Sequence, residues 1–322
     1  TRNQRLGRRR AGQRLGHGPR HGLAGYDAAE QIEEDDLNAL VVKRCALRIE
    51  GEPWDDERSA LEHDDRLRER LGLERGAIFS RQPWMYTAEE RAITADVRAR
   101  YRFTASTIPA DGLSLVVERP DRVRIRVNGR DLTREPRGWF HDRAFAMIPV
   151  ADLVQRGENE VELRWSAYGY DDGIEWIYLA GNFTVGSSDH GATLEEHVPF
   201  ALGPWTSQGR PYYTGSVTYE TTVDLPHEFE LPRAEAARLE LPGLSAIAAD
   251  VRVNGRAAGT VAFHPPAIGI GRLLRTGRTA IRVTVHNSMQ NLLGPHDRDG
   301  ERGIVTPGSF YGTDDTFFAE TT

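Results

Sequence analysis

The chain has 322 residues, enough for about two domains at roughly 150 residues each. Its formal charge of −7 argues against a dedicated nucleic-acid binder, and its apolar runs are far shorter than the ~18 residues of a membrane-spanning helix. Cys45 is the single cysteine, so the fold must form without an internal disulfide. We therefore expect neither a nucleic acid nor a membrane as a partner.

Residues 1–37 have a composition that disfavours folding. Up to residue 25 they are mostly Arg, Gly and His, and residues 27–36 are strongly acidic. Such segments bury too little apolar surface to order themselves, so we expect a disordered or poorly ordered lead. A nucleic-acid-binding arm is the less favoured interpretation of the basic run. The lack of an initiator Met and of an apolar leader indicates a piece of a longer protein.

Residues 38–91 are expected to form a short mixed connector. Apolar runs at 39–42 and 46–49, closed by a turn, predict two short strands. Leucines within the highly charged stretch that follows predict one amphipathic helix, ended by Gly72 or Gly76.

From Ala92 to nearly residue 290 the sequence predicts short strands. Apolar and polar residues alternate with a period of two, and Gly, Pro, Asn or Asp interrupts the alternation at short intervals. Arginines fill many of the polar positions, as they do on a solvated sheet face. The pattern predicts an all-β fold.

One unit of this pattern occurs twice. Val127-Asn128-Gly129-Arg130 recurs as Val253-Asn254-Gly255-Arg256, and Asn-Gly is a strong hairpin signal because both residues tolerate positive φ. In each copy an apolar strand follows, then a turn with Leu and Gly, then a strand at 160–165 or 280–285. The copies are about a domain length apart, which indicates duplicated domains rather than a solenoid.

These patterns predict the organisation of the whole chain. We expect two tandem antiparallel β-sandwich domains, at 92–190 and 191–312, after the mixed connector at 38–91. The remaining residues, 313–322, would be a tail.

The order of these motifs resembles the jelly-roll sugar-binding domain of family-2 glycoside hydrolases, which has a galactose-binding-like fold. Pro211–Glu220, with the strand that it leads into, is similar to the beginning of that domain, and Ala99–Phe103 is the matching segment of the first copy. Asp172–Phe183 is similar to its closing strand. Asn287–His296 resembles the ends of large bacterial glycoside hydrolases that carry such modules after a catalytic barrel.

The resemblance implies an accessory role. The chain would be a carbohydrate-binding or structural pair of sandwiches, the C-terminal part of a bacterial glycoside hydrolase whose catalytic domain is missing. Its partners would be an oligo- or polysaccharide and that N-terminal catalytic domain, and the location, cytoplasmic or exported, stays open. The alternative is a glycoside hydrolase fragment that contributes active-site carboxylates directly to the hydrolysis of O-glycosyl bonds.

No catalytic residue is assigned from the sequence. Glycosidases need two carboxylates about 5–9 Å apart, and the chain has two acidic clusters, one formed by Asp171, Asp172 and Glu175 and one near its end at 314–320. Solvated turn residues are the favoured interpretation of both, with Asp172 or Glu175 as the candidate for a contribution across an interface. Strands do not alternate with helices as a (β/α)-barrel requires.

No cofactor or metal is expected either. Asp297–Glu301 only faintly resembles a calcium loop, because the later bidentate Glu is missing at the required spacing. The histidines lack the paired spacing of a zinc site.

Carbohydrate binding needs exposed aromatic rings, with amide or imidazole groups beside them to bond hydroxyls. Most aromatic residues of a sandwich pack in its core, but Trp139 and Trp205 follow Gly- and Pro-containing loop sequences, where function concentrates. The candidate sugar-binding residues are Trp139, Trp176, Trp205, Tyr213, Asn291 and His296.

Overall fold

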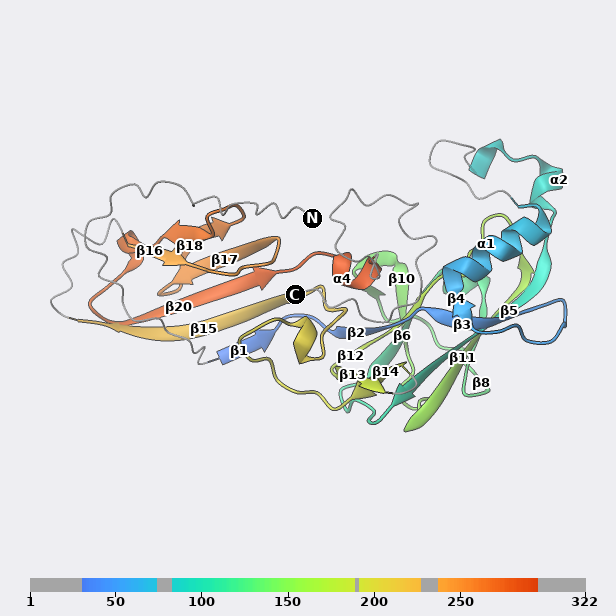
Figure 1. The fold of residues 1–322 in the computed structure, drawn as a ribbon, viewed down its shortest axis with the longest axis horizontal. Coiled ribbons are helices and arrows are strands. Elements are labelled where there is room, and N and C mark those ends of the chain that lie inside the picture. Colours follow the sequence, from blue (N-terminus) through green and yellow to red (C-terminus); the bar gives the residue numbers. More distant parts are fainter. Residues whose placement is uncertain (1–30, 74–82, 189–190, 227–236, 295–322) are drawn as a thin grey trace, which may run out of the picture.

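The computed structural model describes residues 31–73, 83–188, 191–226 and 237–294. The predicted lead up to residue 30, the predicted tail and His296 lie outside these ranges. The described chain consists mainly of β-strands in four sheets, with only short helices (Figure 1). The all-β sandwich fold predicted from the alternating pattern is confirmed.

Two sheets form the first sandwich. One has the order β2-β12-β6-β10-β9, and the other has the order β13-β14-β5-β11-β7-β8 with β3 and β4 beside β5. Neighbouring strands are antiparallel except for β14 and β5, which run parallel. The bounds are β2 Asn38–Val42, β3 Arg44–Ile49, β4 Arg58–Ser59, β5 Ala95–Ala105, β6 Leu113–Glu118, β7 Arg124–Val127, β8 Arg130–Asp131, β9 Trp139–Phe140, β10 Asp142–Pro149, β11 Gly157–Tyr168, β12 Ile177–Gly181, β13 Thr184–Ser188 and β14 Gly191–Glu195.

The period-two pattern of β5 shows how the core forms. Val97, Ala99 and Tyr101 are fully buried, whereas the arginines between them are partly exposed. Successive side chains of a strand point to opposite faces of a sheet, so one face of β5 closes the core and the other carries charge.

The two strands predicted at 38–49 belong to the first sandwich. β2 pairs with β12, and β3 pairs with β5, so neither lies in a separate connector. All five residues of β2 are buried. A short apolar run predicts a strand such as β2, but its partner β12 lies more than 130 residues away in the sequence, and pairing over that distance is decided by the tertiary fold.

The predicted helix is α1, Ala60–Leu71, and it ends at Gly72, whose φ of 70° is the left-handed conformation of a helix C-cap. Leu67 packs into the sandwich core, and the His63 imidazole lies 2.9 Å from the carbonyl oxygen of Cys45. The other helices of the described ranges are short: α2 Ala88–Arg91, α4 Gln290–Leu293, and 3₁₀ turns at Pro83–Met85, Pro120–Arg122, Thr206–Gln208 and Gly271–Leu273.

The second sandwich has a five-stranded sheet and a two-stranded one. The larger sheet has the order β1-β15-β20-β17-β18, and β16 pairs with β19 in the smaller sheet. Its buried core, which includes Val251 and Val253, is separate from the core of the first sandwich. The bounds are β1 Gln31–Glu34, β15 Ser216–Leu225, β16 Arg238–Glu240, β17 Ala248–Val253, β18 Arg256–Val261, β19 Ala267–Gly269 and β20 Gly277–His286.

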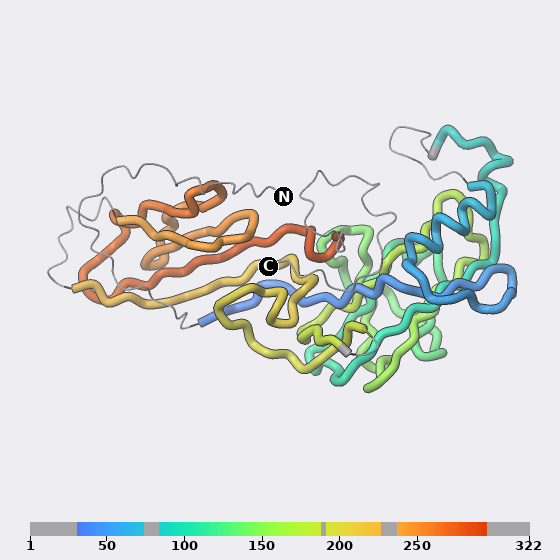
Figure 2. Tube along the Cα trace, viewed as in Figure 1, coloured from blue at the N-terminus to red at the C-terminus, as the bar shows by residue number. Residues whose placement is uncertain are grey.

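β1 differs from the expectation for the lead. The acidic segment around it was expected to be poorly ordered, yet Gln31–Glu34 pairs along β15. Figure 2 shows the blue N-terminal segment running from the side of β15 into the first sandwich. Backbone hydrogen bonds to a long strand stabilise this segment in a way that its composition does not reveal.

The duplicated unit is visible in matching contacts. Asn128 and Asn254 both have a φ of 50° at the start of their turns. The Asn128 amide donates to the carbonyl oxygen of Leu153 at 2.9 Å, and the Asn254 amide donates to that of Leu273 at 3.0 Å. Each Asn side chain therefore ties its hairpin to the Leu-containing turn, which confirms the hairpins predicted from the repeated motif.

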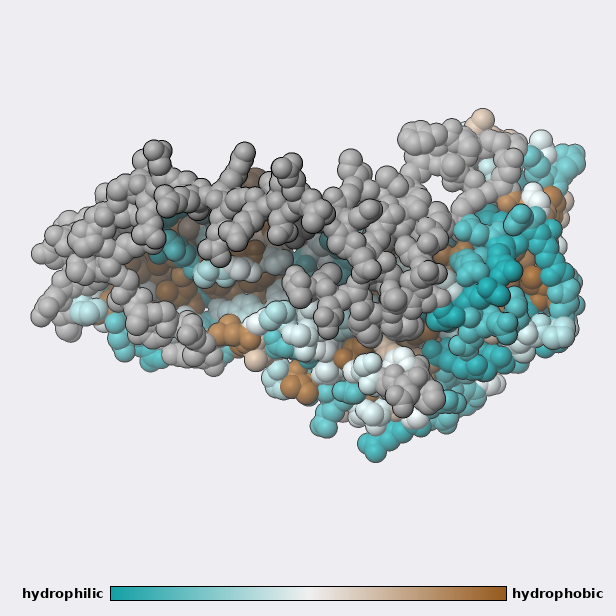
Figure 3. Space-filling model, viewed as in Figure 1, coloured by the Kyte–Doolittle hydropathy of each residue, from teal (hydrophilic) through white to brown (hydrophobic). Residues whose placement is uncertain are grey.

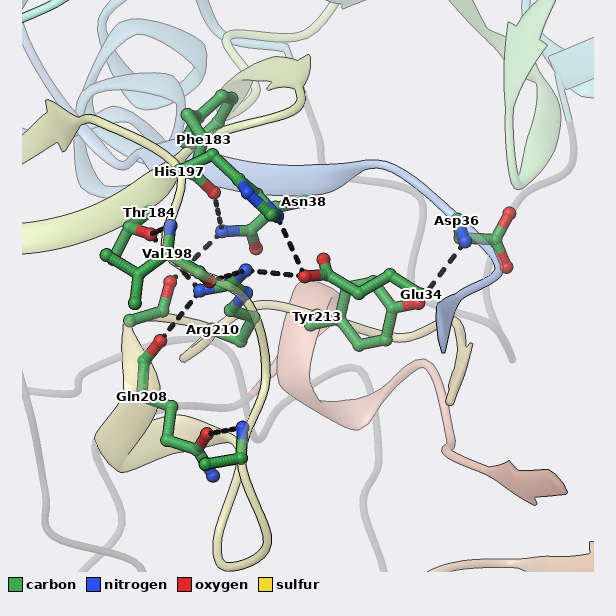
Figure 4. Close-up of polar contacts among 12 residues, drawn as sticks. Glu34, Asp36, Asn38, Phe183, Thr184, His197, Val198, Gln208, Arg210 and Tyr213 are labelled. Carbon is green, nitrogen blue, oxygen red and sulfur yellow. Dashed lines mark hydrogen bonds and ion pairs between the residues drawn. The ribbon is translucent and has the colours of Figure 1, made fainter. Parts of the chain in front are cut away.

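A buried arginine joins the two sandwiches (Figure 4). The side chain of Arg210 is fully buried, and its guanidinium contacts the Glu34 carboxylate at 2.6 Å and the carbonyl oxygen of Val198 at 2.6 Å. It also donates to Thr184 Oγ1 at 3.1 Å. Glu34 ends β1 and Thr184 begins β13, so this one cation connects both sandwiches through the segment between them.

Replacing Arg210 by Met is expected to destabilise the protein by about 3–5 kcal/mol, because it leaves the carboxylate of Glu34 without its buried counter-ion. Urea unfolding followed by tryptophan fluorescence measures the change. Arg256→Met, at the exposed first residue of β18 in the second sandwich, is the matched control and should change stability little. Equal stability of the two variants would contradict the role assigned to Arg210.

Candidate carbohydrate-binding site

Trp139 is the predicted sugar-binding residue with the most exposed ring. It lies in β9, the edge strand of its sheet, and 55% of its surface is exposed. The preceding Gly138 has a φ of 84°, which a residue with a side chain rarely adopts. The guanidinium of Arg143 lies 5.6 Å from the centre of the indole ring. An exposed indole beside a hydrogen-bond donor is the arrangement that stacks on a pyranose and bonds its hydroxyls.

The residues that follow Trp139 anchor it. Phe140 is buried in the sandwich core, and His141 lies with Nε2 2.8 Å from Thr214 Oγ1. Burial lowers the pKa of His141, although the nearby Asp36 carboxylate opposes this effect. A neutral imidazole can accept a hydrogen bond from the Thr214 hydroxyl. The Trp139 hairpin is thereby attached to the segment that joins the two sandwiches.

Three of the predicted residues lie together at the junction of the sandwiches, where they make packing contacts. Tyr213 is fully buried, and its ring centre lies 5.6 Å from that of Trp205 and 5.8 Å from that of Phe200. The indole nitrogen of Trp205 donates to Tyr219 Oη at 2.7 Å. The Asn291 amide donates to the carbonyl oxygen of Tyr213 at 3.2 Å. As folded, Tyr213 offers no ring face to a ligand.

Trp176 has a different environment. It is partly buried against the first core, and the ammonium of Lys43 lies 5.7 Å from its ring centre. The same ammonium lies 6.0 Å from the ring of Tyr212.

His296, the last of the six residues, lies outside the described ranges. The structure therefore brings Trp205, Tyr213 and Asn291 together and leaves Trp139 apart from them at the sheet edge.

The acidic cluster at 171–175 is tied into the fold. Asp172 is almost fully buried, and its two carboxylate oxygens accept hydrogen bonds of 3.0 and 2.9 Å from Arg122. The backbone nitrogen of Gly169 donates to it at 3.0 Å. Asp171 forms an ion pair of 3.2 Å with Arg91. These contacts fix the loop that closes one end of the sandwich.

Changing Asp172 to Asn is expected to lower the free energy of unfolding by about 2 kcal/mol, because charge-assisted hydrogen bonds to Arg122 are lost in a buried site. Thermal and urea unfolding measure the loss. The matched control is Asp224→Asn, at an exposed position of β15, which should have little effect. An unchanged midpoint for the Asp172 variant would show that this carboxylate does not stabilise the loop.

No metal site or membrane helix is found in the described part of the chain. Within these ranges no three His, Cys, Asp or Glu side chains form a group that could hold a metal ion. The helices of the same ranges are too short or too polar to cross a membrane. The acidic segments at 297–301 and 314–320 lie outside them.

His141 and Arg143 belong to the Trp139 site, although the sequence did not predict them there. Neither belongs to a recognisable motif, and their contacts arise from the hairpin geometry of β9 and β10. A cation four residues after an exposed Trp on a short hairpin is the one signal that the sequence offered.

These features define an all-β protein of two β-sandwiches that displays a tryptophan at one sheet edge. No protein-family model matches the chain, and no curated protein does.

Solved structures with similar stretches are glycoside hydrolases. The α-L-rhamnosidase of Streptomyces avermitilis, complexed with L-rhamnose, is 18% identical over 61% of this chain and 22% of its own, with a TM-score of 0.28. The β-D-mannosidase of Dictyoglomus thermophilum is 13% identical over 80% of this chain and 31% of its own, with a TM-score of 0.27. The β-glucuronidase of Ruminococcus gnavus is 10% identical over 80% and 40%, with a TM-score of 0.26.

The chain thus spans between about a fifth and two fifths of the length of these three enzymes.

Proposed function

We propose that this chain is an accessory carbohydrate-binding pair of galactose-binding-like sandwiches, the C-terminal part of a glycoside hydrolase whose catalytic domain is a separate region of the same protein. Its direct ligand would be an oligo- or polysaccharide. The motif order and its resemblance to family-2 sugar-binding domains support the assignment.

The observation that carries the proposal is the exposed indole of Trp139. Its hairpin is held by the buried Phe140 and by the His141–Thr214 hydrogen bond, so the backbone that carries the ring is fixed before any ligand arrives. A preorganised backbone lowers the entropy cost of binding. Arg143 supplies N–H donors beside the ring for hydroxyl groups of a sugar.

The alternative, a fragment that contributes active-site carboxylates, has less support. Asp172 would have to leave two hydrogen bonds with Arg122 before it could act on a glycosidic oxygen. A catalytic acid or nucleophile needs a free approach to the substrate and a partner carboxylate across the sugar ring. The ion pair of the buried Asp172 carboxylate with Arg122 instead suits a structural role.

Trp139→Ala is expected to abolish retardation of the chain in affinity gels that contain its glycan, because stacking on the indole is lost. Soluble xylan, galactan, arabinan and rhamnogalacturonan are the probes. Trp84→Ala is the matched control, since Trp84 is 77% exposed but lies near α2, on a different part of the surface. Trp205→Ala, at the buried junction, should affect stability more than retardation.

Circular dichroism would establish that each variant remains folded. Equal retardation of the Trp139 variant and the unmodified chain on every glycan that binds would contradict this site. Absence of retardation on all probes would leave a structural role for the pair.

The purified chain is expected to release no nitrophenol from aryl glycosides, because the carboxylates at 171–172 are engaged in ion pairs that hold the fold. Panels of α- and β-linked nitrophenyl sugars measure this. Robust turnover that disappears in Asp172→Asn or Glu175→Gln, with the variants still folded, would favour the alternative.

A further inference from the structure

Four arginines are aligned across four strands of the first sandwich. Arg124 of β7 is opposite Arg164 of β11, Arg164 is opposite Arg98 of β5, and Arg98 is opposite Arg48 of β3. We call these four residues the arginine row. Neighbouring strands are about 4.8 Å apart, so the row places a guanidinium on each of four successive strands.

The arginine row faces outward from the core. The strand neighbours Ile125, Leu163, Val97 and Leu47 are all buried in the sandwich core, and successive side chains point to opposite faces of a sheet. Figure 3 shows hydrophilic side chains gathered over the lobe that carries α1 and β3. The row therefore lies on a solvated sheet face, as the alternating arginines of the sequence indicated.

Like charges directly opposite one another destabilise a sheet, and the chain compensates the row only in part. Asp96 forms hydrogen bonds with Arg164, and Asp131 lies 3.1 Å from Arg124. The Asp131 carboxylate also forms an ion pair of 2.7 Å with Arg126. These carboxylates hold the two guanidinium groups in place without using all of their donors.

Arg98, near the middle of the row, has the least satisfied guanidinium. Its closest carboxylates, Asp96 and Glu162, lie 3.9 and 3.7 Å away. It donates no hydrogen bond to any residue of the described ranges, although a guanidinium has five N–H donors. Its side chain is 29% exposed, so an incoming anion can reach it.

A hollow lies at each end of the row. One of about 260 Å³ is lined by Arg48, Arg98 and Asp96 together with Glu50 and Gly51. The other, of about 510 Å³, is lined by Arg124 and Arg164, by the hydroxyl-bearing residues Thr133 and Ser166, and by Asp121 and Asp131. Cations at regular spacing next to hydroxyl donors and acceptors fit a ligand that repeats both an anion and free hydroxyl groups.

We propose that the arginine row binds an acidic oligosaccharide laid across the strands, with uronic acid carboxylates on the accessible guanidinium groups of the row. The inference rests on the proposed function in carbohydrate binding but uses a different surface from Trp139. Guanidinium groups match planar carboxylates in a bidentate geometry. A polysaccharide fits the row better than a nucleic acid, because Thr133 and Ser166 beside the row can bond free hydroxyl groups.

The test is affinity electrophoresis of the full chain in gels containing polygalacturonate at low ionic strength. Arg98→Gln combined with Arg124→Gln should weaken retardation about tenfold, because two charge-assisted contacts are lost. The matched control combines Arg256→Gln with Arg278→Gln, two exposed arginines of the second sandwich, and should behave like the unmodified chain. Retardation should fall as salt is raised.

Each other outcome overturns the inference. Equal loss of retardation in both double variants would show that polygalacturonate binds the chain through its overall charge alone. If polygalacturonate causes no retardation while neutral glycans still bind through Trp139, the arginine row is not a binding site and the proposed function stands. Tighter, arginine-dependent binding of heparin would assign the row to sulfate groups rather than carboxylates, and tighter binding of single-stranded DNA would assign it to a nucleic acid.

Discussion

The guanidinium of Arg210 is fully buried between the two sandwiches, and the groups that compensate its charge come from both of them. Taking a cation out of water costs several kcal/mol unless hydrogen bonds and a counter-ion replace its hydration. Glu34 from β1, Thr184 from β13 and the carbonyl oxygen of Val198 supply that replacement. The N-terminal strand, the first sandwich and the segment before β15 must therefore meet at this point for the fold to be stable.

This constraint also decides which aromatic residues are left for a ligand. Trp205 and Tyr213 pack with Phe200 around the junction, and the guanidinium of Arg210 lies 4.6 Å from the ring of Phe200. Their rings stabilise the connection between the sandwiches. Trp139 lies on an edge strand outside this cluster, which is why its indole stays exposed.

The two sandwiches share a framework but differ in their surfaces. Asn128 and Asn254 each donate to the carbonyl oxygen of a leucine in the turn that follows, and each accepts a backbone N–H of the next strand. The outer face of the first copy carries four arginines in a row, whereas the corresponding sheet of the second aligns two, Arg252 and Arg282. There Glu220 stands opposite Arg282 and forms an ion pair of 2.7 Å with it. A common fold does not imply a common function, so each surface is to be tested separately.

Local patterns in the sequence determined the all-β class, the two Asn-Gly hairpins and the end of α1 at Gly72, because alternation, turn chemistry and helix caps act over a few residues. The partners of β1 and β2, the burial of Tyr213 and the alignment of the arginine row were decided only by the tertiary structure. Those features depend on strand register and on contacts between segments far apart in the chain, and a single sequence carries no local signal of either.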